Sequence, residues 1–423
     1  MKSVAIIGAG WAGLAAATAL ANHAHVTLFE AGRVAGGRAR QIAKSTEPFD
    51  NGQHILIGAY RETLALLNQF GVDTQKAFLR QPLHWIMRSP TDRVEVKMPA
   101  WPTPWHWLGA GLFTRGLSWS ARGQLLRAVS ALIRCRFVIE PAKTVAQWLT
   151  EQSQADALIE RFWEPLTLAT LNTPIANASM AVLATVLRDS LAGRSGAADF
   201  MIPRKTLTEI FVAPAQTWLT QQGADFRFSQ RIQAGQLTPT AQGVEIAGEP
   251  FDAAIIAVAP HHVPALIEHE PMWHDLADTL KAWPSGAITT IQLYYSRPPR
   301  FEQAMLGFAG GVVQWAFDRS ALDGQHGWIS VVISCSETKD KNTLVEQVIH
   351  ELDQYFQCGK PVISRLFTEK RATFLCQANM ARPQAHIAPH VWLAGDYLLP
   401  EYPATLESAV RSGLAAAHAL MKH

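Results

Sequence analysis

The sequence predicts an α/β fold in which one domain is assembled from three separate parts of the chain, with a second, α+β domain inserted between them. Three observations predict it. A strand, a glycine-rich turn, a helix and a second strand follow one another over residues 3–30; an apolar strand recurs at 251–260; and a strand and helix close the chain at 391–413. Such alternation is typical of a parallel sheet covered by helices.

Composition excludes several classes of protein. The chain has 423 residues, and 37 Lys and Arg against 35 Asp and Glu leave a formal charge of +2. A nucleic-acid-binding protein would need a basic stripe to neutralise phosphates, so no nucleic-acid partner is expected. Hydrophobic residues make up 48% of the chain, which excludes a disordered protein. At about 150 residues per domain, this length predicts two or three domains.

The cysteines indicate a reducing compartment. There are four, widely spaced, with no Cys-x-x-Cys and no paired Cys/His pattern: Cys135, Cys335, Cys358 and Cys376. The sequence therefore predicts neither a disulfide framework nor a metal site, and a cytoplasmic location.

The first element is an uncharged run over residues 4–21, which with Lys2 before it imitates a signal peptide or a short membrane span. Three glycines inside the run, Gly8, Gly10 and Gly13, predict a turn instead. Residues 3–7 read as a strand and residues 14–21 as a helix, because the first are partly β-branched and the second rich in Ala and Leu.

A second strand over 25–29 ends at Glu30, 20 residues after Gly10, and this order is that of a Rossmann-type dinucleotide-binding unit. The first glycine makes the turn, the second admits a pyrophosphate, and the third lets the helix pack on the strand. The helix N-terminus faces the phosphates, while Glu30 accepts hydrogen bonds from ribose hydroxyls, which favours FAD or NAD over NADP. The expected cofactor contacts are Gly8, Gly10, Trp11, Ala12, Gly13, Glu30 and Ala31.

Two further segments are ambiguous alone and informative together. Residues 36–40, Gly-Gly-Arg-Ala-Arg, fit a solvated loop, and Asn51-Gly52 fits a turn. After the motif above, residues 36–40 resemble the GGR signature of the flavin amine oxidase and phytoene desaturase superfamily. The resemblance implies a glutathione-reductase-like FAD-binding domain, Arg38 near the pyrophosphate, and backbone beside the isoalloxazine at residues 50–54. It adds Gly37, Arg38, Asn51, Gly52, Gln53 and His54 to the expected contacts.

The C-terminal strand and helix, read alone, are a capped amphipathic helix after a short strand. By resemblance, Asp396 binds the flavin ribitol, and the helix starting near Ala404 points its N-terminus at the pyrimidine edge. That positive helix end would stabilise negative charge on the reduced flavin. The contacts implied here are Gly395, Asp396, Ala404, Thr405 and Leu406.

The predicted FAD-binding domain therefore comprises residues 1–80, 201–284 and 386–423, and the predicted substrate domain comprises 81–200 and 285–385. Helical patterns at 124–138 and 144–164, and a strand pattern at 287–295, make the substrate domain α+β.

Fourteen tryptophans lie mostly in the predicted substrate domain, and only Trp11 precedes residue 85. The charge-poor segment 101–119 contains Trp101, Trp105, Trp107 and Trp119. Two interpretations stay open: these rings line a core or pocket, or they meet a membrane surface, because indole is apolar with one polar N–H. The segment is too short to span a bilayer.

Over nearly its whole length, the chain resembles the squalene-associated FAD-dependent desaturase-like family, whose assigned activity is hydroxysqualene dehydroxylase of the hopanoid route. The blocks that discriminate best are 51–60 and the pair of stretches 162–166 and 171–173, which contain Trp163 and Asn172. Thr290 and Thr405 fall where amine oxidases carry a flavin-side lysine and an aromatic-cage tyrosine, which disfavours amine oxidation. The glycine- and proline-rich end of bacterial phytoene desaturases is also absent.

This resemblance implies a C30 isoprenoid substrate, hydroxysqualene, that loses its hydroxyl with the help of a proton and receives hydride from reduced FAD, giving squalene. It also implies an electron donor for FAD, a peripheral position on the inner face of the membrane, and isoprenoid synthases as partners. Two other functions stay open: a carotenoid or squalene desaturase, and a flavin-bound membrane adaptor without turnover.

Four residues are candidates for the chemistry around the substrate. His54 is the candidate acid, although a structural histidine is the plainer interpretation. Trp163, Asn172 and Thr290 are the candidate substrate-pocket residues, while Trp163 also fits a core position and Asn172 a turn or cap.

Overall fold

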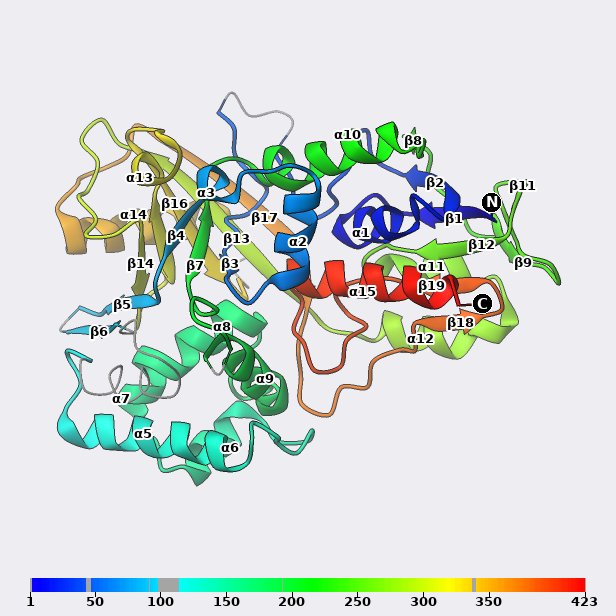
Figure 1. Ribbon diagram of the computed structural model, residues 1–423. Helices are drawn as coiled ribbons and strands as arrows, with labels where there is room; N and C mark the ends of the chain where they lie inside the picture. The colour runs from blue at the N-terminus through cyan, green and yellow to red at the C-terminus, as the bar shows by residue number, and fades with distance from the viewer. Residues whose placement is uncertain are drawn as a thin grey trace.

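The computed structural model describes residues 2–42, 47–90, 92–97, 114–191, 193–336 and 340–422. Two large sheets lie side by side and are joined by a small one (Figure 1).

The first sheet confirms the predicted α/β fold. Its strand order is β18-β19-β12-β1-β2-β8, and β1 pairs in parallel with both β12 and β2. β19 and β8 extend the parallel part, and β18 adds an antiparallel edge. The strands are β1 (Lys2–Ile7), β2 (Ala24–Glu30), β8 (Asp225–Phe228), β12 (Ala253–Ile256), β18 (His386–Ala388) and β19 (Val391–Leu393).

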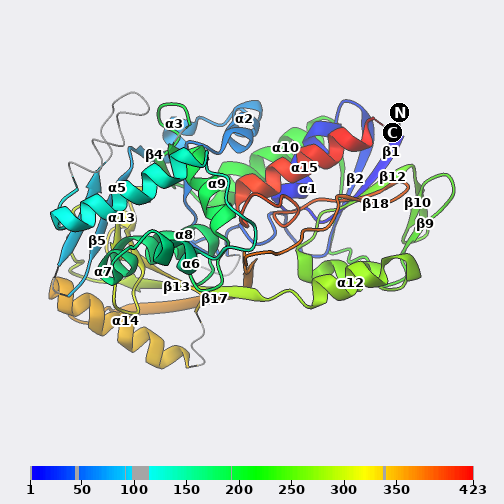
Figure 2. The same ribbon diagram turned by 90° about the horizontal axis from the view of Figure 1, so that it is seen from below.

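Both faces of this sheet are covered, which explains why β1 is apolar and buried from Val4 to Ile7. Val4 and Ile6 face the helices α1, α10 and α15, whereas Ala5 and Ile7 belong to the cluster on the opposite face. Figure 2 shows the three helices together on one side of the sheet. They are α1 (Trp11–Leu20), α10 (Ala213–Gln221) and α15 (Leu406–Leu420); on the other side lie β9 (Leu237–Pro239), β10 (Val244–Ile246), β11 (Glu249–Phe251), η3 (Pro260–His262), α11 (Val263–Ile267), η4 (Pro271–Trp273) and α12 (His274–Lys281).

The uncharged run 4–21 is therefore the inner strand β1 and the enclosed helix α1, which is buried at nine of its ten residues. α15 presses on it so closely that a Cβ on Gly413 would lie 2.1 Å from the Ala12 carbonyl oxygen. Within the described ranges, no helix is long and apolar enough to cross a membrane.

The second sheet has seven strands in the order β17-β13-β16-β15-β14-β5-β6, antiparallel except between β14 and β5. Helix α14 (Lys341–Phe356) packs on one face through Leu344, Val348 and Leu352. The other face carries Trp85, Trp315 and other apolar side chains. The strands are β5 (His84–Arg88), β6 (Arg93–Lys97), β13 (Ser285–Tyr294), β14 (Met305–Phe308), β15 (Trp315–Asp318), β16 (Trp328–Ser334) and β17 (Ile363–Phe374), with α13 (Arg319–Asp323) between β15 and β16.

Helices cover that apolar face, and their bounds differ from the sequence prediction. The helix predicted at 124–138 begins at Trp119, where Ser118 caps it, and ends at Arg134. The helix predicted at 144–164 is interrupted after α6, because Ser153 adopts a φ of +52°. The elements are α5 (Trp119–Arg134), α6 (Val145–Glu151), α7 (Asp156–Leu158), η1 (Ile159–Trp163), α8 (Glu164–Leu171) and α9 (Met180–Leu191).

A small sheet in the order β3-β7-β4 lies between the two large ones. It and its neighbours are β3 (Leu56–Ile57), α2 (Arg61–Gln69), α3 (Thr74–Ala77), β4 (Phe78–Gln81), β7 (Phe200–Pro203) and η2 (Thr208–Val212).

Candidate active site

A cavity of about 930 Å³ lies between the two large sheets. Gly8 after β1 and Ala257 to Ala259 after β12 line it, so it opens at the carboxyl ends of neighbouring parallel strands. Because the chain leaves β1 for β2 on one side and β12 lies on the other, this is the position where doubly wound sheets bind ligands.

The three glycines of the turn have different roles. A Cβ on Gly8, whose φ is +107°, would lie 2.6 Å from the Ala257 carbonyl oxygen, and a Cβ on Gly13 would lie 2.0 Å from the Gly8 carbonyl oxygen. Both positions therefore need glycine for the fold. A Cβ on Gly10 would meet only the Gly37 Cα, at 4.0 Å, in the described chain. The missing side chain at Gly10 leaves space on the cavity side, where a pyrophosphate fits.

The start of α1 is prepared for an anion. Gly10 is its N-cap, no side chain of the described residues caps it, and its first turn contains no acid. The first-turn N–H groups and the positive end of the helix dipole therefore remain available for phosphate oxygens.

Glu30 is positioned by the backbone on both sides of it. One carboxylate oxygen accepts a hydrogen bond from the Ala9 N–H at 2.9 Å, and the other accepts from the Gly32 N–H at 2.7 Å. Each oxygen keeps a lone pair, and the residue lines the cavity, so the carboxylate can also accept from ribose hydroxyls.

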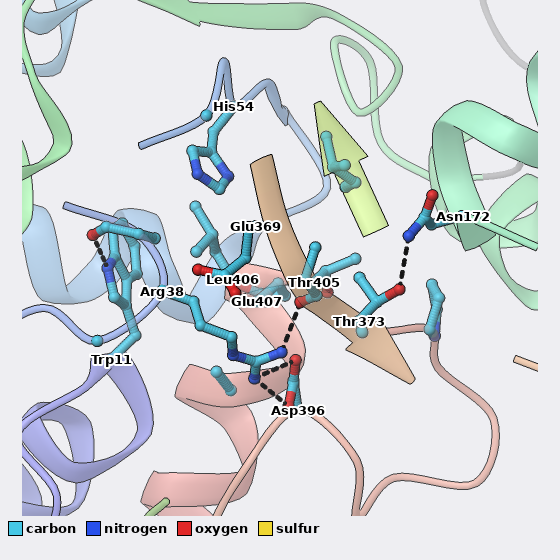
Figure 3. Close-up of a pocket in the computed structure, with 18 of the residues that line it drawn as sticks. Trp11, Arg38, His54, Asn172, Glu369, Thr373, Asp396, Thr405, Leu406 and Glu407 are labelled. Carbon is cyan, nitrogen blue, oxygen red and sulfur yellow. Dashed lines mark hydrogen bonds and ion pairs between the residues drawn. The ribbon is translucent and has the colours of Figure 1, made fainter. Parts of the chain in front are cut away.

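Arg38 and Asp396 form a bidentate ion pair across 358 positions of the chain (Figure 3). Arg38 Nη2 donates to both Asp396 oxygens at 2.8 Å, and Nη1 donates to the Ala372 carbonyl oxygen at 2.6 Å. The Asp396 side chain is only 8% exposed. The resemblance places these residues at the pyrophosphate and the ribitol, and both line the cavity.

The N-terminus of α15 also reaches the cavity. The helix begins at Leu406, two residues after the predicted start, because Thr405 Oγ1 accepts the Ser408 N–H at 3.1 Å. Ala404, Thr405 and Leu406 line the cavity together with Gly395. A helix end there can stabilise negative charge.

His54 lies in the cavity wall, where its ring points toward the middle of the site (Figure 3). Burial, and secondarily the positive charge of Arg38, lower the pKa of His54 from 6.5 to about 4, so the ring is neutral at pH 7. Its Nε2 is buried without a hydrogen-bond partner in the described chain, as is Thr290 Oγ1.

These two unpaired atoms lie close to one glycine. A Cβ on Gly52 would be 3.5 Å from His54 Nε2 and 4.0 Å from Thr290 Oγ1. Leaving a buried polar group unpaired costs about 1–3 kcal/mol. His54, which lines the cavity beside the expected isoalloxazine contact, therefore fits a bound group that carries hydrogen-bonding atoms of its own, as FAD does.

The far end of the cavity is apolar. Trp85 packs edge-on against Trp315 with ring centroids 4.8 Å apart, and Phe162 lies 6.2 Å from Trp85. We call this end the apolar chamber; among the described residues its lining is uncharged and comprises Leu83, Trp85, Val96, Leu125, Leu126, Val129, Phe162, Leu166, Ile288, Met305, Trp315, Phe317 and Val332.

The structure corrects three assignments. Trp163 is 1% exposed and packs between Trp148 and Phe162, with its N–H donated to Gln154, so it is a core residue and not a pocket residue. Thr290 is buried outside the cavity lining, and Gly13 packs on Gly8 without reaching the cavity.

Asn172 fits both of its interpretations. It ends α8 in a left-handed conformation with φ of +45°, and it lines the cavity. Its side chain donates to Thr373 Oγ1 at 2.8 Å and accepts the Cys335 N–H at 2.9 Å.

In the tryptophan-rich segment, Trp101, Trp105 and Trp107 lie outside the described residues, and Trp119 is 78% exposed.

Several residues that line the cavity were not predicted from the sequence. The strand at 251–260 was expected, and ligands bind beyond the carboxyl ends of parallel strands, so the loop after it could have been named. Other contributors had no local signal, because distant segments bring them in. The missed residues include Gln230, Arg231, Ile232, Ala257, Val258, Ala259, His261, His262, Glu369, Ala372, Thr373, Asp189, Ser190 and Tyr402.

Within the described ranges, no group of three or more His, Cys, Asp or Glu side chains could hold a metal ion.

Comparisons with known proteins agree with this geometry. The model of the family described as flavin-containing amine oxidoreductase matches residues 11–421. A hydroxysqualene dehydroxylase of Zymomonas mobilis subsp. mobilis is 27% identical over 446 residues, covering 100% of both chains. A zeta-carotene desaturase of Capsicum annuum is 25% identical over 183 residues, 39% of this chain and 30% of the relative.

Solved structures show the same fold at low identity. An oxidoreductase from Methanosarcina mazei superposes with a TM-score of 0.75 at 13% identity, covering 100% of each chain. With the family match over residues 11–421 and a cavity whose glycine turn, acid and helix ends fit FAD, the chain belongs to the flavin-containing amine oxidoreductase family and is an FAD-dependent oxidoreductase.

Proposed function

We propose that the protein reductively dehydroxylates hydroxysqualene, a C30 isoprenoid alcohol, to squalene. The observation that carries the proposal is the continuity of the FAD-binding segments with the apolar chamber in one cavity. An uncharged chamber suits a hydrocarbon chain, whereas an ammonium substrate would leave its charge unpaired there. Full-length similarity to a hydroxysqualene dehydroxylase supports the same choice.

The reaction consumes one proton and one hydride. The C–O bond breaks, the protonated hydroxyl leaves as water, and a C–H bond forms at the same carbon. Reduced FAD supplies the hydride when bound. The chain's own residues orient the alcohol and exclude water, through the aromatic rings of the apolar chamber.

We assign the proton to His54. With a pKa lowered to about 4, the imidazolium is scarce at pH 7. If it donates the proton, turnover rises as pH falls from 6.5 toward 4, and His54→Gln removes this rise while FAD stays bound. An unchanged pH–rate profile in His54→Gln would show that another group donates the proton and that His54 acts only as a hydrogen-bonding group.

Anaerobic incubation with hydroxysqualene and dithionite-reduced FAD tests the reaction. We expect one squalene for each FADH₂ oxidised, measured by gas chromatography with mass spectrometry and by the return of flavin absorbance. Absence of squalene, with the flavin still reduced, would refute the proposal.

A charge placed in the apolar chamber gives a matched pair of variants. Leu166 lines the chamber, so Leu166→Glu should abolish squalene formation and leave FAD binding intact. Val362 is 66% exposed, and Val362→Glu, which adds the same charge, should keep full activity.

A desaturase is the second candidate, supported by similarity to a zeta-carotene desaturase. It would use the same cavity with oxidised FAD as the electron acceptor. If the oxidised enzyme desaturates a polyprene and the reduced enzyme does not convert hydroxysqualene, the protein is a desaturase.

The proposed reaction also requires an electron donor and a source of the apolar substrate. Catalysis in the reductive direction needs an electron donor for FAD, and an isoprenoid alcohol this apolar reaches the enzyme from a membrane surface or from the synthase that makes it. We therefore propose a peripheral position on the inner face of the membrane.

A further inference from the structure

Helix α5 separates the apolar chamber from the outside of the molecule. It runs along the outer edge of the helical layer (Figure 1), with Leu125, Ala128 and Leu132 buried against the core. Leu126 and Val129, on the flank of the same helix, line the cavity. One helix thus contacts the core, the cavity and the exterior.

An apolar stripe runs along α5 from the exterior to the chamber. Residues seven apart return to nearly the same side of a helix after two turns, so Trp119, Leu126 and Ile133 share one stripe. Trp119 is 78% exposed and Ile133 is 46% exposed, while Leu126 between them lines the cavity. Val138, four residues beyond the helix, is 76% exposed.

A basic stripe lies beside the apolar one. Arg127 and Arg134 each follow a member of the apolar stripe by one residue, and both are exposed, as is Arg136 just beyond the helix. These three arginines have no carboxylate partner among the described residues. Arg122 lies over the Trp119 ring at 4.7 Å. The chain has no Asp or Glu between Glu95 and Glu140.

We propose that α5 is the membrane-docking face of the protein and that its arginines bind a bilayer rich in anionic phospholipid. The proposal rests on the proposed function only in using the chamber for an isoprenoid. Trp119, Ile133 and Val138 enter the interfacial region of the leaflet, and Arg127, Arg134 and Arg136 meet the phosphate groups. Leu126 then leads an apolar substrate from the leaflet into the chamber.

Two features favour a bilayer over a partner protein. An in-plane membrane helix combines exposed Trp and aliphatic side chains with a basic flank, and α5 has both. Leu126 of the apolar stripe also lines the uncharged chamber, so the exposed face lies directly beside a site for a molecule that partitions into lipid.

Vesicle flotation with the FAD-loaded protein tests the proposal. We expect binding to vesicles of phosphatidylcholine with 30% phosphatidylglycerol (roughly the anionic content that makes polybasic binding measurable), and weak binding to phosphatidylcholine alone. Binding should fall as salt rises from low ionic strength, because the Debye length shortens.

Two double variants locate the face. Arg127→Gln/Arg134→Gln should weaken partitioning by roughly 25-fold, about fivefold for each arginine removed. Trp119→Ser/Ile133→Ser should also weaken it, with less dependence on salt. Flavin absorbance of each variant checks that the protein remains folded and loaded.

Matched control variants remove the same charge, or shorten an exposed apolar side chain, at positions outside α5. Arg297→Gln/Arg300→Gln removes the same charge from the exposed loop between β13 and β14, and Met272→Ser shortens a side chain that is 59% exposed. Both should bind vesicles like the parent protein. Equal loss in these controls, no binding to anionic vesicles, or binding that requires a second protein would overturn the proposal.

Vesicle binding needs neither substrate nor electron donor. A protein that floats with anionic vesicles through α5 but makes no squalene would refute the proposed reaction and keep this inference. A protein that makes squalene but does not bind anionic vesicles would refute this inference and keep the proposed reaction.

Discussion

Replacing Gly10 by valine should weaken FAD binding without destabilising the folded apoprotein. Gly10 has a φ of −77°, which any residue adopts, and a Cβ there would meet only the Gly37 Cα, at 4.0 Å, in the described chain. The folded apoprotein should therefore tolerate Gly10→Val. FAD should not, because the side chain occupies the space beside the start of α1 that a pyrophosphate needs.

The magnitude follows from the size of the overlap. Overpacking a filled space by a few methyl groups costs about 1–3 kcal/mol. At about 1.4 kcal/mol for each factor of ten, FAD affinity should fall by roughly 5- to 150-fold, with Gly10→Ala at the low end. Melting of the apoprotein should shift little, since losing glycine's flexibility offsets the less favourable N-cap residue.

The matched control is Gly13→Ala. A Cβ at Gly13 would lie 2.0 Å from the Gly8 carbonyl oxygen, so α1 must move away from β1 and the apoprotein melting temperature should drop sharply. FAD titration by absorbance and calorimetry, with thermal melting of each apoprotein, measures both effects. Full FAD affinity in Gly10→Val, or equal destabilisation of the two apoproteins, would refute the reasoning.

Three further predictions follow from single contacts. Arg38→Met leaves the Asp396 carboxylate, 8% exposed, without its partner; the loss of up to about 3–5 kcal/mol should lower the melting temperature, and adding Asp396→Asn should recover part of it in calorimetry. The folded-state pKa of His54, about 4, lies below its ordinary 6.5, so its contribution to stability is complete above pH 6.5 and is lost as pH falls toward 4. Melting temperatures of His54→Gln should therefore decline less over that range, and an equal decline would contradict the pKa. Asn172→Ala should lower the free energy of denaturant unfolding by about 1–3 kcal/mol, because Thr373 Oγ1 and the Cys335 N–H each lose a hydrogen bond to the Asn172 side chain, while FAD titration should be unchanged.

Local motifs were the predictable part of the site. The strand, turn, helix and strand over residues 2–30 occur as expected, and Glu30 faces the turn through the Ala9 and Gly32 N–H groups. A strand followed by a glycine turn and a helix places its own backbone, so residue type and spacing suffice. The start of α15 was likewise predicted to within two residues, because Thr405 is a side-chain cap that acts locally.

Side-chain orientation within the substrate region was not predictable in this way. Trp163 and Asn172 lie in one stretch of helix and turn, yet the Trp163 ring is enclosed by Trp148 and Phe162, whereas Asn172 lines the cavity. The orientation of each side chain is decided by the residues that surround it in space, and these come from other segments of the chain.

By itself, the sequence determined the nucleotide-binding unit, the cofactor class and the division of strands among three parts of the chain, since each depends on residues close together along the backbone. Only the tertiary structure decided that Arg38 pairs with Asp396, that Gly413 admits α15 onto α1, and that α5 presents one stripe to the exterior and the chamber. Such contacts depend on packing between distant segments, and packing is set by shape and burial, which periodicity and residue type do not specify.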